Sequence, residues 1–106
     1  MAWRVEVREE AAAVLKELPP DIRASFRRIV ELIEAVGLER IREPYVKHLE
    51  GALWEMRMTG REGIARAAYV TASGWRVVVV HVFAKKTQRT PRREIEIALR
   101  RAKEVR

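Results

Sequence analysis

The sequence contains no cysteine, and this absence excludes several kinds of site. Disulfides and thiolate metal centres cannot form, and the composition is compatible with a reducing compartment. Long apolar runs are also missing, because stretches such as 77–80 are far below the roughly 20 residues that span a bilayer. Arg4, Glu6 and Arg8 stand where a signal peptide needs an apolar segment. We therefore expect a cytoplasmic protein with no membrane partner.

Several functional motifs are absent as well. The sequence has no phosphate-binding glycine loop, no His or acid cluster with metal-ligand spacing and no nucleophile elbow. We therefore expect no cofactor and no metal. Any chemistry must come from Arg, Lys, Glu, Tyr and His side chains.

The charge that is present is unevenly distributed along the 106 residues, which we interpret as a single domain over 1–106. The whole chain has a net charge of +7, yet residues 1–53 carry a net −1 and residues 54–106 a net +8. Such asymmetry favours a polyanionic partner, with nucleic acid first and an acidic protein second. An Arg-rich solvated surface remains the alternative, since composition does not show that the charges share a face.

Hydrophobic periodicity predicts seven elements in the order β-α-α-β-β-β-α. The strands are expected at 3–7, 53–58, 64–70 and 75–83, and the helices at 9–18, 20–36 and 91–105. Pro20 opens the second helix and Gly37 ends it, while Thr90 is expected to cap the last helix. We treat 38–51 as a connector. This order predicts an α+β fold with a mostly antiparallel sheet, in which the last strand lies inside the sheet and the position of the first is undecided.

The stretch 77–93 passes from a buried strand to a cationic loop. Residues 77–83 are apolar except for His81, and residues 84–93 hold five basic side chains and no acid. The strands expected at 53–58 and 64–70 form a hairpin. If this hairpin pairs near Arg57 and Arg66, those guanidinium groups lie close together. The loop then brings Lys85 and Lys86 to the same region.

Four cations that converge in this way suit a phosphodiester, because they can stabilise the extra negative charge of a phosphorane transition state. Glu55 shares the strand face of Arg57 and is the carboxylate placed to act as a base. The expected catalytic residues are therefore Arg57, Arg66, Lys86, Glu55 and Lys85. Residues expected to bind RNA are Lys47, His48, Arg61, Arg89, Arg92 and Arg93.

Structural roles compete with these assignments. Arg66 can simply pair with Glu55 or Glu62 across the hairpin. Strict alternation puts Tyr69 on the face opposite Arg66, which favours a core role, and His81 is favoured as a hydrogen-bonded core residue. Strand tryptophans such as 54 and 75 can stack bases but more often pack against helices.

Three segments together resemble a known family. They are Lys47-His-Leu-Glu-Gly-Ala-Leu-Trp-Glu-Met-Arg57, Arg66-Ala-Ala-Tyr69 and His81-Val-Phe-Ala-Lys-Lys-Thr-Gln-Arg-Thr-Pro91. The chain resembles RelE/HigB-type toxins of bacterial toxin–antitoxin modules, in the phage-derived branch with a Phe-x-Lys-Lys-Thr-x-x-Thr-Pro signature. The resemblance covers essentially the whole chain.

This resemblance implies a compact α+β fold of the microbial ribonuclease type. It also implies a metal-independent endoribonuclease that cleaves messenger RNA on the ribosome and so inhibits translation. The implied partner is a cognate antitoxin, a helix-turn-helix protein of the HigA type, and operator DNA is contacted only through the antitoxin complex. In residue terms, Arg66 matches the arginine of the family's Arg-x-x-Tyr motif, and Lys86 matches a basic residue after the last strand.

The sequence also departs from the pattern. Arg57 and Glu55 stand where relatives often place lysines, and the Tyr or His that several relatives carry near the C-terminus has no counterpart at 92–94. Arginine is a poor proton shuttle because its pKa exceeds about 12. Lys85, Lys86, His81 and Glu55 remain the candidates for proton transfer. A ParE-like gyrase poison, or a non-catalytic protein that binds nucleic acid or antitoxin, remains the alternative function.

Overall fold

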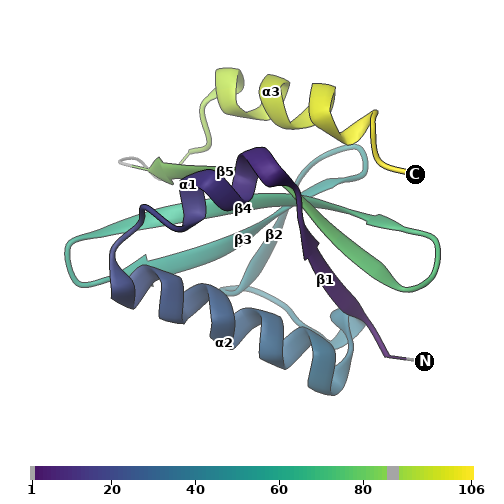
Figure 1. The fold of residues 1–106 in the computed structure, drawn as a ribbon, viewed down its shortest axis with the longest axis horizontal. Helices are drawn as coiled ribbons and strands as arrows, with labels where there is room; N and C mark the ends of the chain where they lie inside the picture. The colour runs from purple at the N-terminus through teal and green to yellow at the C-terminus, as the bar shows by residue number, and fades with distance from the viewer. Residues whose placement is uncertain (1, 86–88) are drawn as a thin grey trace.

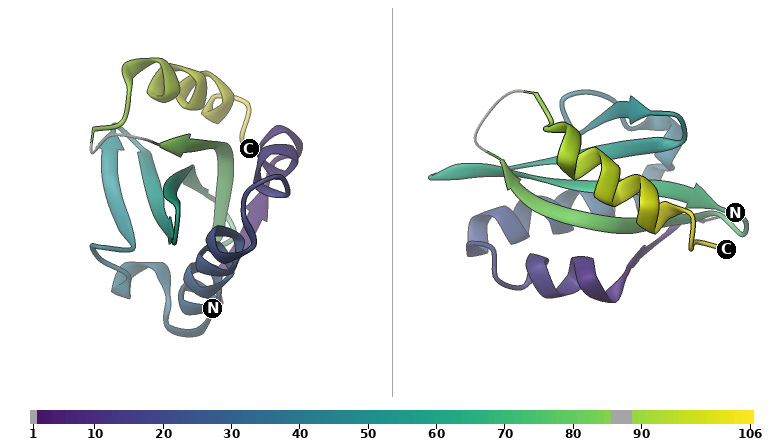
Figure 2. Two further views of the ribbon diagram at one scale, coloured as in Figure 1. Left: turned by 90° about the vertical axis from the view of Figure 1, so that its left-hand side faces the viewer. Right: turned by 90° about the horizontal axis from the view of Figure 1, so that it is seen from above.

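The computed structural model describes residues 2–85 and 89–106, which form one five-stranded sheet with helices on both faces (Figures 1 and 2). The sheet order is β1-β5-β4-β3-β2, with β1 parallel to β5 and all other neighbours antiparallel. The predicted α+β class with a mostly antiparallel sheet is therefore confirmed. The elements are β1 (Arg4–Val7), α1 (Glu9–Leu15), α2 (Pro20–Val36), a 3-10 turn (Leu38–Arg40), β2 (Val46–Glu50), β3 (Leu53–Gly60), β4 (Gly63–Ala72), β5 (Arg76–Lys85) and α3 (Arg92–Ala102).

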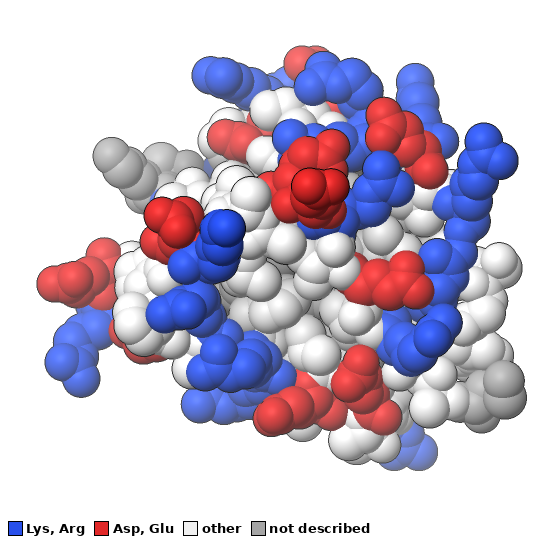
Figure 3. All heavy atoms as spheres, in the orientation of Figure 1, with Lys and Arg blue, Asp and Glu red and all other residues white. Residues whose placement is uncertain are grey.

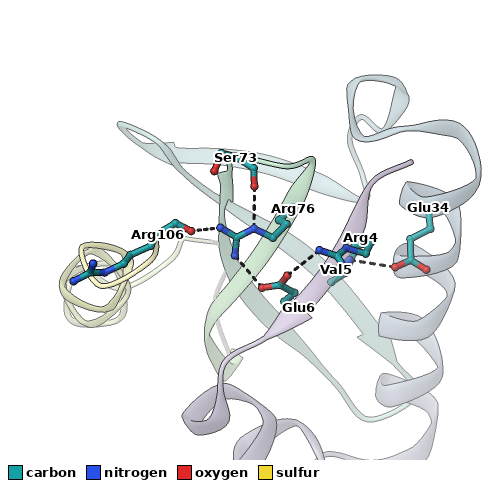
Figure 4. A network of polar contacts seen from close by, with 7 residues as sticks. All are labelled: Arg4, Val5, Glu6, Glu34, Ser73, Arg76 and Arg106. Carbon is teal, nitrogen blue, oxygen red and sulfur yellow. Dashed lines mark hydrogen bonds and ion pairs between the residues drawn. The ribbon is translucent and has the colours of Figure 1, made fainter. Parts of the chain in front are cut away.

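Strand β5 lies inside the sheet, as its apolar sequence predicts, between β1 and β4. The edge position of β1 is fixed by tertiary contacts at the start of β5 (Figure 4). Arg76 donates to Glu6 Oε1 at 3.2 Å, to the Ser73 carbonyl at 2.9 Å and to the carbonyl of Arg106. This network joins β1, the β4–β5 turn and the C-terminus at the end of β5 farthest from Lys85.

Helices α1 and α2 cover one face of the sheet. The apolar stripe predicted for α2 is the one that is buried, with Ile22, Phe26, Ile29 and Ile33 all below one tenth exposed. Pro20 occupies the first helical turn, where its missing N–H costs no hydrogen bond. Gly37 ends the helix at a φ of 95°, a conformation that favours glycine.

Helix α3 covers part of the other face, where the apolar cluster is smaller. Its buried members are Leu53, Ala68, Val70, Val78, Val80 and Ala98. Helix α3 reaches over only part of this face, and polar residues of β3, β4 and β5 occupy the rest. That asymmetry leaves room for a polar site on the α3 side of the sheet.

The structure corrects the assignment of 38–51 as a connector. Residues Val46–Glu50 form the edge strand β2, which pairs with β3 as Lys47 with Glu55 and His48 with Trp54. A register shift between His48 and Glu50 interrupts the ladder. The other predicted strands and helices are all present, with ends shifted by a few residues.

Charged side chains of both signs are interspersed on the face shown in Figure 3, so no single-sign patch dominates this view. In residues 2–85 and 89–106, no helix is long and apolar enough to cross a bilayer.

Candidate active site

The β3–β4 hairpin places its polar residues on the α3 side of the sheet. The register pairs Arg57 directly with Arg66 and Glu55 with Ala68, so these side chains share one face. Leu53, which has the same parity as Glu55, packs in the α3-side cluster. Met56 and Met58, of the opposite parity, pack under α2. The convergence of Arg57, Arg66 and Glu55 that alternation predicts is therefore confirmed.

Glu55 and Arg66 form a buried ion pair, which is the structural alternative that the sequence left open for Arg66. Arg66 Nε lies 3.3 Å from Glu55 Oε2, and the two residues are 3% and 1% exposed. Arg66 also donates from a terminal nitrogen to the carbonyl of Ala65 at 3.1 Å. Its buried Nε has no well-aligned hydrogen bond among the described residues, so its contact with Glu55 is an ion pair without ideal hydrogen-bond geometry.

Thr90 joins this pair, which the sequence did not predict. Its hydroxyl donates to Glu55 Oε1 at 2.8 Å, and Lys85 Nζ donates to the same hydroxyl at 3.1 Å. The expectation that Thr90 caps α3 is wrong, because Pro91 occupies the N-cap position and no side chain caps the helix. A threonine before proline is a common helix start, so the sequence favoured a capping role. The hydrogen bond from the Thr90 hydroxyl to Glu55 could not be predicted from this pattern.

A β-bulge aims Lys85 at this cluster. Val77 and Val79 face α2, so regular alternation would also turn residues 81 and 85 towards α2. The ladder instead pairs Tyr69 with Val79 and Ala68 with His81, which leaves Val80 as the extra residue. The extra residue reverses the parity of the rest of the strand. Lys85, 5% exposed, consequently lies on the α3 side with Glu55 and Arg66.

The buried cluster opens onto a cavity of about 330 Å³ beside β2. Glu55 and Thr90 form part of its wall, together with Lys47, His48 and Arg89. Lys47 is exposed and lies opposite Glu55 in the β2–β3 ladder. Three of the residues expected to bind RNA therefore line a cavity that contains the candidate base.

Burial and neighbouring charges shift the pKa values of the cationic groups. Burial lowers the pKa of Lys85, and the positive charges of Arg66, Arg57 and Lys47 lower it further, whereas Glu55 opposes the shift. Burial also lowers the pKa of Arg66, again opposed by Glu55. Arginine stays charged at neutral pH despite such a shift, whereas a lysine becomes easier to deprotonate. Lys85 is thus the more suitable proton donor.

The remaining predicted residues are more scattered. Arg57 contacts Glu43 at 3.7 Å at the rim of the cluster. Arg61 lies in the β3–β4 turn, where its backbone N–H donates to Asp21 of α2 at 2.6 Å. Arg92 is paired with Glu50 and Glu96, and Arg93 is exposed in the first turn of α3. Lys86 lies outside the described residues.

His81 and Tyr69 occupy positions that agree with their expected structural roles. His81 is 8% exposed and contacts Glu94 Oε1 through Nε2 at 2.7 Å and Arg101 through Nδ1 at 3.2 Å. Because arginine only donates, Nδ1 accepts and Nε2 carries the proton to Glu94. Tyr69 is 2% exposed in the α2-side core, and burial raises its pKa. His81 therefore anchors α3 to β5, and Tyr69 faces away from the cluster.

Comparison with solved structures assigns the fold class. A double arginine-to-alanine mutant of Escherichia coli RelE toxin in the free state is 20% identical, with a TM-score of 0.65 and coverage of 98% of this chain and 97% of that chain. The archaeal RelE–RelB complex from Pyrococcus horikoshii OT3 is 23% identical, with a TM-score of 0.58 and coverage of 79% of this chain and 96% of that chain. The toxin–antitoxin complex RelBE2 from Mycobacterium tuberculosis is 19% identical, with a TM-score of 0.59 and coverage of 80% of this chain and 100% of that chain. The chain has the fold of RelE toxins.

Comparison with protein families is more specific. Residues 13–103 match the family described as phage derived protein Gp49-like (DUF891), and the chain belongs to this family. A comparison with curated proteins gives no match.

Proposed function

We propose that this chain is the toxin of a toxin–antitoxin module and acts as a ribosome-dependent, metal-independent endoribonuclease on messenger RNA. The observation that carries the proposal is the placement of Glu55 on the wall of a cavity, with Arg66 on one oxygen and Thr90 on the other. A buried carboxylate, two arginines and a buried lysine supply the groups that phosphodiester transesterification needs. The likeness to RelE structures supports this reading at the level of the fold.

The proposed reaction uses the 2′-hydroxyl of the substrate as nucleophile. Glu55 accepts the proton of this hydroxyl while its oxygen attacks the adjacent phosphorus. Arg66 and Arg57 stabilise the added charge on the phosphoryl oxygens, with Lys86 as a third cation in the proposal. Lys85 donates a proton to the departing 5′-oxygen. Its lowered pKa brings this ammonium closer to the strength of a useful acid at neutral pH.

The proposed protein partner is a cognate antitoxin of the helix-turn-helix type, which would also connect the toxin to operator DNA. Two of the structures with this fold are RelE–RelB and RelBE2 toxin–antitoxin complexes, and these support an antitoxin partner. The proposed substrate is messenger RNA in the ribosome, and the proposed location is the cytoplasm. Lys47, His48 and Arg89 line the cavity and would contact the RNA near the cleaved bond.

The test is to map cut sites on translated messages in a ribosome-containing extract, together with induced expression in cells. We expect growth arrest and new 5′ ends on translated transcripts, both weakened by Arg66→Ala and by Lys86→Ala. If both variants stay fully toxic and cut the same positions, the site assignment is wrong. Intact messenger RNA with arrested DNA replication would instead establish the gyrase-poisoning alternative. Binding to RNA without either effect would establish a non-catalytic protein.

A further inference from the structure

Lys85, Thr90 and Glu55 form a continuous hydrogen-bonded chain. The distances are 3.1 Å from Lys85 Nζ to Thr90 Oγ1 and 2.8 Å from Thr90 Oγ1 to Glu55 Oε1. The three side chains are 5%, 8% and 1% exposed. Lys85 ends β5, Glu55 lies on β3, and Thr90 precedes α3, so the chain is assembled by the fold rather than by sequence proximity.

The chemistry of these groups fixes the direction of the chain. An ammonium group only donates and an ionised carboxylate only accepts, whereas a hydroxyl does both. Thr90 must therefore accept from Lys85 and donate to Glu55. A valine or alanine in its place would interrupt the chain, because neither carries a proton that can move along it.

We propose that the Thr90 hydroxyl is the proton relay that returns Glu55 and Lys85 to their starting protonation states after each cleavage. The proposal rests on the function proposed above, in which Glu55 gains a proton and Lys85 loses one in every turnover. Glu55 must then lose its proton and Lys85 regain one before the next substrate can react.

The relay balances in protons and requires no other reactant. After cleavage, protonated Glu55 donates to Thr90 Oγ1, and the Thr90 hydroxyl donates to the neutral amine of Lys85. Transfer of the first proton to Oγ1 and of the hydroxyl proton to Nζ leaves a carboxylate, a hydroxyl and an ammonium group. The resulting polarity is the one that the structure shows, with Lys85 donating to Thr90 and Thr90 donating to Glu55.

Burial explains why an internal route would be used. Lys85 and Glu55 are nearly inaccessible, so direct exchange with bulk water is restricted on both sides. Arg66 contacts the other carboxylate oxygen and cannot act as an acceptor. The transfer runs from a carboxylic acid to an amine, which is the stronger base, so it is favourable without any further driving force.

The experiment compares Thr90→Val and Thr90→Ser with the wild-type protein in two regimes on programmed ribosomes. With toxin in excess, only the first cleavage is measured. With ribosomes in excess, the steady-state rate also includes the return of Glu55 and Lys85 to their starting protonation states. We expect Thr90→Val to lower the steady-state rate at least about tenfold and the first cleavage much less, because Arg66 still holds Glu55. Thr90→Ser keeps the hydroxyl and is expected to restore most of the steady-state rate.

Added imidazole at constant pH and ionic strength should raise the steady-state rate of Thr90→Val and not that of the wild type, because a small buffer can replace an internal proton relay. Equal losses in both regimes without imidazole rescue would show that Thr90 only positions its neighbours and would overturn the relay. A Thr90→Val protein as fast as the wild type would also overturn it while leaving the proposed ribonuclease intact. A wild-type protein that cleaves nothing would overturn both proposals.

Discussion

The hydroxyl of Thr90 donates a 2.8 Å hydrogen bond to Oε1 of Glu55, although 35 positions separate the two residues. The other carboxylate oxygen of Glu55, Oε2, contacts Arg66 in the same buried cluster. Glu55 is thereby oriented with both oxygens occupied at the edge of an open cavity. Several measurable consequences follow from this arrangement.

Replacement of Glu55 by glutamine is expected to abolish most of the proposed cleavage. Glutamine keeps the shape but cannot accept the 2′-hydroxyl proton, and loss of a general base typically costs about 10²- to 10⁴-fold in rate. The measurement is cleavage of translated messenger RNA in a ribosome-containing extract. Glu62→Gln is the matched control, because Glu62 is exposed in the β3–β4 turn. Equal activity of Glu55→Gln and Glu62→Gln would remove Glu55 from the mechanism.

The Glu55–Arg66 pair is expected to show strong coupling in stability. Arg66→Met leaves a buried carboxylate without its cation, and breaking a buried pair from one side costs about 3–5 kcal/mol. The double variant Glu55→Met, Arg66→Met removes both charges and should recover a large part of that loss. Urea unfolding of the two single variants and the double variant measures the coupling. A double variant whose loss equals the sum of the single losses would contradict a coupled pair.

The sequence offered this pair as an alternative to a catalytic role for Arg66, with Glu62 as the other possible partner, because the pairing depends on local features. Alternation along the hairpin and a short turn determine which residues of β3 and β4 share a face. The β-bulge that turns Lys85 towards α3 depends on packing of Val80 and is invisible in a run of valines. Strand β2 was missed because it is an edge strand, largely exposed, that exists through its pairing with β3. The position of β1 likewise depends on distant contacts such as Glu6 with Arg76.

Lys85 is expected to make stability increase with pH in the alkaline range. Burial lowers its pKa from the ordinary value of 10.5, so the unfolded chain binds this proton more tightly than the folded chain does. Between the folded pKa and 10.5 the unfolded state therefore holds more protons, and the free energy of unfolding rises as pH increases. Chemical denaturation of the wild type and Lys85→Met from neutral pH to about 10 measures the effect. The wild type should gain stability relative to Lys85→Met, and a constant difference would show that burial does not shift this group.

Lys47 is expected to contribute more to RNA binding than Arg92 does. Among the described residues Lys47 makes no ion pair, whereas Arg92 is bound by Glu50 and Glu96. Each phosphate contact on a single strand adds about 0.7 to the slope of log affinity against log salt concentration. Lys47→Ala should reduce the magnitude of this slope by about 0.7, the value for one phosphate contact. Arg92→Ala should reduce it by less, although both substitutions remove one positive charge. Equal slopes for the two variants would indicate a general charge effect rather than a site at the cavity.

Tyr69 is expected to be dispensable for the proposed cleavage, despite its place in the Arg-x-x-Tyr motif. It lies in the α2-side core at 2% exposure, on the opposite side of the sheet from Glu55, and burial raises its pKa and keeps the phenol protonated. Its hydroxyl makes no hydrogen bond in residues 2–85 and 89–106, so Tyr69→Phe removes no internal contact. Cleavage by this variant should stay within about twofold of the wild type, and its free energy of unfolding within about 1 kcal/mol. A loss of cleavage of tenfold or more with unchanged stability would mean that the RNA also reaches the α2 side of the sheet, and the reaction would then have to be assigned to different residues.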